Sequence, residues 1–146
     1  MVYLIVGSFS FLLFLLFDLN QLRSISRTFR SFFFLGSGLL AAATILLLLQ
    51  EGWGNTPFLP RLAGAIGMAI ALGLLTHSLF IALGFKESYL QEGGGKVLVS
   101  WGAYSLCRHP GVLWFILFYL SLWLFSGSIL IFQAGLLWSL LNVLYA

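Results

Sequence analysis

Residues 96–115 read KVLVSWGAYSLCRHPGVLWF, and within them a polar stretch gives way to an apolar helix. Arg108 and His109 stand directly before Pro110, where that helix is predicted to begin. Proline is favoured at the first helical position, because the N–H group that it lacks would have no partner there. The free N–H groups that follow, together with the positive end of the helix dipole, favour an anionic group. The sequence thus predicts a guanidinium and an imidazole beside an anion site.

Outside this stretch the composition is that of a protein in a lipid bilayer. The 146 residues are 61% hydrophobic and 8% charged, whereas soluble domains carry about 25% charged residues. We therefore expect an integral membrane protein. The net charge of +3 is small, so it does not suggest nucleic acid and is better explained as topology charge. The single cysteine, Cys107, excludes an internal disulfide.

The apolar stretches predict an all-α fold: one membrane domain with five transmembrane helices. Asp18 ends the first stretch, and residues 51–60, EGWGNTPFLP, predict a loop. Residues 126–128, Ser-Gly-Ser, suffice only for a tight turn, so the last two spans should form a helical hairpin. The N-terminus lacks a basic n-region and a cleavage site, and we interpret it as a retained span. The expected spans are residues 2–17, 31–50, 62–85, 111–125 and 129–145.

Small residues predict the faces along which these helices meet, since they let helices approach closely in lipid. His77 ends one such face, and an ionisable residue inside a span is a functional hypothesis by default. The alternative, a neutral histidine bonded across helices, remains open. The predicted faces are Gly36, Gly38 and Ala42 in the second span, and Ala65, Ala69, Gly73 and His77, four residues apart, in the third.

Loop charge predicts the orientation. Arg23, Arg27 and Arg30 follow the first span, as a basic loop or a short interfacial helix, and the third loop is also basic. The positive-inside rule places both loops in the cytoplasm. The N-terminus is then outside, and the Arg108–Pro110 segment and the C-terminus face the cytoplasm.

Residues 98–110, LVSWGAYSLCRHP, resemble the signature of the isoprenylcysteine carboxyl methyltransferase and phospholipid methyltransferase superfamily. That pattern runs roughly L-V-x-x-G-x-Y-x-x-x-R-H-P-x-Y-x-G. The clear resemblance covers about residues 96–128, and the upstream spans match only in general character. The matching positions are Leu98, Val99, Gly102, Tyr104, Arg108, His109 and Pro110.

The resemblance implies a membrane enzyme that uses S-adenosyl-L-methionine at its cytoplasmic face. The substrate would be lipophilic or membrane-delivered, of the isoprenylcysteine carboxylate or phospholipid type. Arg108 and His109 would be the catalytic pair. Arg108 would bind a carboxylate of the cofactor, and His109 would donate a hydrogen bond or act as a base. The cofactor-binding residues implied are Gly102, Tyr104, Arg108, His109, Pro110 and Gly111.

The chain departs from the family pattern in two ways. Val112 and Trp114 stand where the family has Tyr and Gly, which suggests a divergent, NnrU-like branch. Family members also continue into a charged cytoplasmic tail, whereas this chain ends at Ala146, as a fragment or a member without a complete site.

Two other functions remain open: a sterol-reductase-like membrane reductase with a nicotinamide cofactor, and a non-catalytic NnrU-like protein.

No cluster of Cys, His, Asp or Glu has metal-ligand spacing, and the sequence carries no signal of oligomeric state. Four tryptophans are expected to be interface or packing aromatics, namely Trp101, Trp114, Trp123 and Trp138.

Overall fold

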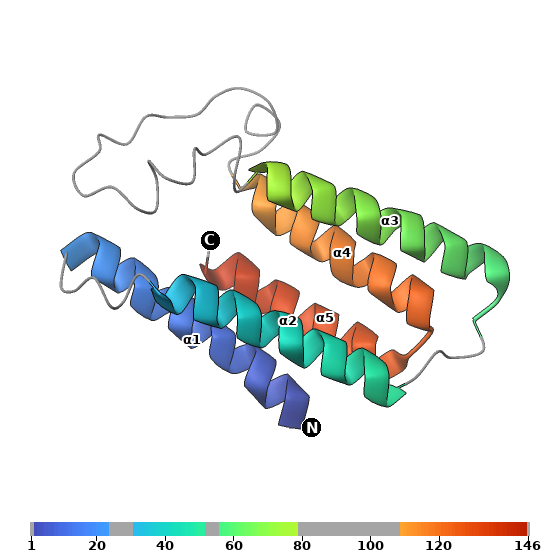
Figure 1. Cartoon of the computed structure of the whole chain (residues 1–146), viewed down its shortest axis with the longest axis horizontal. Helices are drawn as coiled ribbons and strands as arrows, with labels where there is room; N and C mark the ends of the chain where they lie inside the picture. Colours follow the sequence, from blue (N-terminus) through green and yellow to red (C-terminus); the bar gives the residue numbers. More distant parts are fainter. Residues whose placement is uncertain (1, 24–30, 52–55, 79–108, 146) are drawn as a thin grey trace.

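The described residues form five helices. A computed structural model describes residues 2–23, 31–51, 56–78 and 109–145. No strand occurs in these ranges, so the predicted all-α class is confirmed for them. Successive helices run in alternating directions, in two layers (Figure 1). The helices are α1 Val2–Arg23, α2 Ser31–Glu51, α3 Phe58–Thr76, α4 Pro110–Ser126 and α5 Ile129–Tyr145.

The surface of this bundle suits lipid rather than water. The helices α1, α2 and α3 are long and apolar enough to cross a membrane, and α4 and α5 are shorter apolar helices. Large apolar side chains cover the outside: Ile5 is 70% exposed and Leu144 is 74% exposed. Soluble monomers rarely expose extended apolar surface. The long apolar helices therefore indicate an integral membrane protein.

Two predicted boundaries differ from the helices observed. The first helix does not end at Asp18 but continues to Arg23, because residues 18–23 contain no Gly or Pro to break it. The third begins at Phe58 rather than Leu62, with Pro60 in its first turn. Proline is tolerated there, since the first N–H groups of a helix have no intrahelical partner. The last part of the predicted third span, residues 79–85, lies outside the described residues.

The predicted hairpin between the last two helices is confirmed. Gly127 closes α4 in a left-handed conformation with φ of 68°, and its N–H donates to the Trp123 carbonyl at 2.7 Å. Glycine adopts this conformation without the Cβ penalty of other residues. The Ser128 hydroxyl oxygen then accepts hydrogen bonds from the backbone N–H groups two and three residues further on, which caps the start of α5.

The same serine ties α5 to α2. The Ser128 hydroxyl donates to Oε2 of Glu51 at 2.6 Å. The carboxylate at the end of α2 thus lies beside the start of α5, where the positive end of the helix dipole favours negative charge. The bond joins the three helices α2, α4 and α5 at one end of the bundle.

Helix α4 lies between α3 and α5 and supplies the centre of the core. Its Tyr119 is buried, and its ring meets the Trp138 ring edge-on at a centroid distance of 5.5 Å. Gly135 on α5 lets this ring approach, because a Cβ there would come within 2.7 Å of the Tyr119 Cβ. The buried core consists of Phe11, Leu40, Ala43, Leu47, Tyr119, Leu122, Ile131, Ala134 and Trp138.

The predicted small-residue face of α2 is only partly correct. Gly36 does pack, and a Cβ there would lie 2.8 Å from the Phe14 ring of α1. Gly38 has no neighbour within 4 Å of its Cβ position, and Ala42 is exposed. Offsets of two and six residues do not share one face of a 3.6-residue helix, so the three residues could not form one contact surface.

The predicted packing face of α3 is wrong. Ala69, Gly73 and His77 are exposed, and Ala65 is half-buried. The buried line runs instead through Gly64, Ala71 and Ser78, at seven-residue spacing. Both lines consist of small residues at helical spacing, so the sequence pattern alone did not distinguish them.

A double-mutant cycle will measure the polar contact that crosses from α2 to α4. The Thr44 and Tyr119 hydroxyl oxygens lie 2.8 Å apart in a buried setting. We expect Thr44→Val and Tyr119→Phe each to destabilise the protein, with a coupling energy of about 0.6–1.7 kcal/mol, as for other interhelical bonds in membranes. Unfolding in detergent, followed by circular dichroism, gives the four free energies. A coupling energy of zero would contradict the bond.

Candidate functional site

The motif region is described from His109 onward, and α4 begins there as predicted. Pro110 occupies the first helical position and is buried. His109 is the N-cap residue, with its side chain exposed and no capping hydrogen bond from it. The Val112 N–H donates to the His109 carbonyl at 3.1 Å. An imidazole that makes no capping bond therefore stands at a helix N-terminus, where a nearby anion would be favoured.

The end of α3 lies against this first turn of α4. The indole Nε1–H of Trp114 donates to the Ser78 hydroxyl at 3.0 Å, and Ser78 is 1% exposed. Among the described residues, Gly111 leaves room beside the turn, since the nearest neighbour of its Cβ position is a Leu75 methyl group at 4.0 Å. Two helices, α3 and α4, thus build the described part of the site.

Successive helices run in alternating directions, and this determines which helix ends lie at the same end of the bundle. The C-terminal ends of α1, α3 and α5 and the starts of α2 and α4 lie at the same end of the bundle (Figure 1). His77 and His109 are both exposed and both belong to that end. The end of α5 thus lies at the same end of the bundle as the start of α4, and the side of the membrane that they face stays a prediction from the loop charges.

The structure brings part of the predicted site together. His109, Pro110 and Gly111 lie at the start of α4, and Trp114, further along the helix, contacts Ser78. Their role in binding a cofactor stays a prediction, and Gly102, Tyr104 and Arg108 lie outside the described residues, as do Cys107 and Trp101.

His77 does not pack on another helix as its place on the predicted face of α3 implied, and its functional role stays a prediction. Regular helix α3 ends at Thr76, and His77 and Ser78 form one wider, π-helical turn after it. The His77 side chain is exposed rather than packed against another helix. Such turns often mark functional sites, but it is the neighbouring serine that contacts α4.

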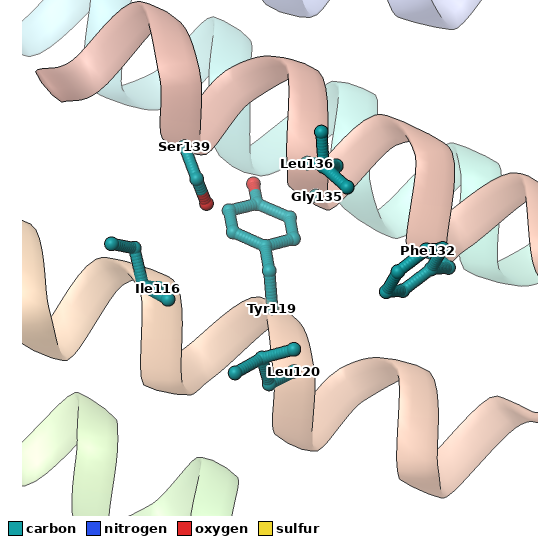
Figure 2. A pocket seen from close by; sticks show the side chains of 7 residues that line it. All are labelled: Ile116, Tyr119, Leu120, Phe132, Gly135, Leu136 and Ser139. Atoms are coloured by element: carbon teal, nitrogen blue, oxygen red, sulfur yellow. The ribbon is translucent and has the colours of Figure 1, made fainter.

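A separate apolar groove lies between α4 and α5. It measures about 130 Å³ and is open on one side. Figure 2 shows Tyr119 extending from α4 toward α5, with Gly135 and Ser139 of α5 close to its ring. The Tyr119 hydroxyl is already paired with Thr44, so the groove offers apolar contact rather than reactive groups. Its lining is Ile116, Tyr119, Leu120, Phe132, Gly135, Leu136 and Ser139.

Sequence reasoning missed the pairing of Trp114 with Ser78. Trp114 was expected to be an interface or packing aromatic. An available signal was the seven-residue spacing of Gly64, Ala71 and Ser78, which extends the packing line of α3 to a polar residue. Trp138, in contrast, is a packing residue as expected and is fully buried.

Comparison with known proteins adds no relative. No family model matches the chain, and no curated protein or solved structure matches it. The described residues also contain no group of three or more His, Cys, Asp or Glu side chains that could hold a metal ion. The resemblance over residues 98–110 therefore stays a prediction from the motif.

Proposed function

We propose that this chain is an integral membrane methyltransferase that uses S-adenosyl-L-methionine and acts on a lipophilic or membrane-delivered substrate. One observation carries the proposal. An exposed His109, whose side chain makes no capping bond, stands at the Pro110-initiated start of α4, at the end of a segment with seven positions of the methyltransferase signature. A helix that only spans lipid has no need of an imidazole and a guanidinium at that point.

The proposed enzyme crosses the membrane five times. Helices α4 and α5 have 17 residues each, which is about 25 Å at helical rise. This length nearly matches a hydrocarbon core of about 30 Å, and the short turn between them brings the chain back at once. The basic loops place the N-terminus outside and the Arg108–Pro110 segment and C-terminus in the cytoplasm, where the cofactor is available.

The chemistry of the described residues fits an anionic part of that cofactor. The start of α4 offers a positive dipole end, the exposed His109 offers a hydrogen bond, and Gly111 leaves space beside them. In the proposal Arg108 binds the carboxylate through charge-assisted hydrogen bonds. His109 orients the bound group or accepts a proton from the acceptor substrate.

The cofactor itself supplies an activated methyl group on a sulfonium ion. The chain's task is then mainly to hold donor and acceptor in line, so a strong base is not required. The groove between α4 and α5 suits the hydrocarbon part of a substrate, because it is apolar and open on one side. Ile116 at the groove is seven residues after His109, about 10 Å along α4.

Calorimetry on the detergent-solubilised protein tests this function. We expect S-adenosylhomocysteine to bind, and Arg108→Ala to weaken its binding about 10- to 100-fold, because a charge-assisted bond to a carboxylate is lost. Arg61→Ala is the matched control, since Arg61 lies in the first turn of α3 at the opposite end of the bundle, and it should leave the affinity unchanged.

The alternatives give different results in the same experiment. Binding of a nicotinamide nucleotide in place of S-adenosylhomocysteine would indicate a reductase. Binding of neither ligand by the wild-type protein would indicate a non-catalytic membrane protein and would overturn the proposal.

A further inference from the structure

The residue at the start of α4 does not cap the helix with its own side chain. The first N–H groups of a helix need partners, and a capping side chain commonly supplies one. His109 occupies the N-cap position without a side-chain capping bond. A contact elsewhere on α4 would therefore help to hold its first turn, which follows the proposed ligand-binding imidazole.

A part-buried hydrogen bond close to this turn supplies such a contact. Trp114 lies five residues after His109, and its indole N–H donates to the Ser78 hydroxyl at 3.0 Å. Ser78 is almost fully buried, so its hydroxyl has little access to water. Trp114 itself is half-buried, and breaking the bond would leave the buried Ser78 hydroxyl without this partner, which costs free energy.

The bond also completes the packing of α3 on α4. Gly64, Ala71 and Ser78 form a line of small residues at seven-residue spacing on the buried side of α3. The first two allow close approach, and the last adds a directional contact at the end where Pro110 is buried. Together they fix both the distance between the helices and the position of the first turn of α4.

We propose that Ser78 and Trp114 are positioning residues of the ligand site, which hold the first turn of α4 and His109 against the end of α3. This inference rests on the proposed function, because it assigns a role toward the ligand bound there. Neither side chain needs to touch that ligand. Trp114 also stands where the resembled family has glycine, so the device belongs to this chain and not to the family signature.

The first test needs no ligand. The protein is labelled with 5-fluorotryptophan, and its ¹⁹F spectrum is assigned with Trp114→Phe and Trp123→Phe. We expect Ser78→Ala to shift or broaden the Trp114 resonance and to leave that of Trp123, in the last part of the same helix, in place. An unchanged Trp114 resonance overturns the inference.

The second test is a double-mutant cycle on the dissociation constant of S-adenosylhomocysteine. Ser78→Ala and Trp114→Phe should each raise it about 3- to 10-fold, the value of one hydrogen bond. The double variant should be no weaker than either single one, because both changes remove the same bond. Trp123→Phe, which loses ring packing with Phe132, is the control and should leave the affinity unchanged.

The outcomes separate the two proposals. Suppose that the wild-type protein binds S-adenosylhomocysteine, but Ser78→Ala and Trp114→Phe leave the affinity unchanged or have simply additive effects. The positioning role is then wrong and the proposed function stands. If the wild-type protein binds none, the proposed function fails, and the positioning role fails with it.

Discussion

Gly64→Ala is expected to destabilise the protein by about 1–3 kcal/mol, the usual cost of overpacking. A Cβ at this position would lie 2.6 Å from both the Phe125 nitrogen and the Ser121 carbonyl oxygen of α4. Both are backbone atoms of a helix, so they cannot move aside as a side-chain tip can. Helices α3 and α4 would have to separate along their whole contact. Thermal unfolding in detergent, followed by circular dichroism, measures the loss.

Gly73→Ala provides the matched control in the same helix. The Cβ position of Gly73 has no neighbour within 4 Å, so the added methyl group meets no atom of the described residues. Alanine is favoured over glycine inside a helix by up to about 1 kcal/mol, and we expect a small gain in stability. Equal effects at Gly64 and Gly73 would contradict the observed packing of α3 on α4.

Trp138→Ala is expected to have the largest effect, a loss of about 3 kcal/mol or more. Trp138 is fully buried, its ring packs on Tyr119, and its Nε1–H donates to the Leu4 carbonyl of α1 at 3.4 Å. Removing the indole leaves a cavity between α1, α4 and α5. In lipid the cost arises from lost packing contacts more than from lost burial out of water. Unfolding by denaturing detergent measures it.

Gly7→Ala provides a control, because the sign of its effect on stability should depend on whether Trp138 is present. A Cβ at Gly7 would overlap the Trp138 indole ring, so Gly7→Ala alone should destabilise the wild-type protein. In the Trp138→Ala background the obstacle is gone, and the same change should be neutral or stabilising. Additive losses in the double variant would show that Gly7 does not pack on Trp138.

Local features of the chain could be predicted because a few residues determine them. Pro110 at the first position of α4 follows from the fixed φ of proline and its missing N–H. The tight turn at Gly127 follows from three small or flexible residues between two apolar stretches. The same reasoning ended α1 too early at Asp18 and began α3 too late at Leu62, because a polar residue such as Asp18 does not end a helix and an early proline such as Pro60 does not prevent one.

The candidate site could be predicted only in part. The motif led to His109, Pro110 and Gly111, which the structure places together at the start of α4. The contact between Trp114 and Ser78 joins residues 36 positions apart in the chain. Residue spacing along the chain does not predict such a contact, because it forms only when α3 and α4 pack together.

The amino-acid sequence alone determines the helical class and the apolar character suited to a membrane. It also determines the hairpin between α4 and α5 and the helix start beside His109. Each depends on composition or on residues close together in the chain. The tertiary structure alone decided which faces meet: Gly64 and Ala71 pack on α4, whereas Ala69 and Gly73 are exposed. The physical reason is that these helices are apolar on all sides, and lipid is as apolar as a protein core. Hydrophobic periodicity therefore marks no inner face, and close steric fit selects it instead.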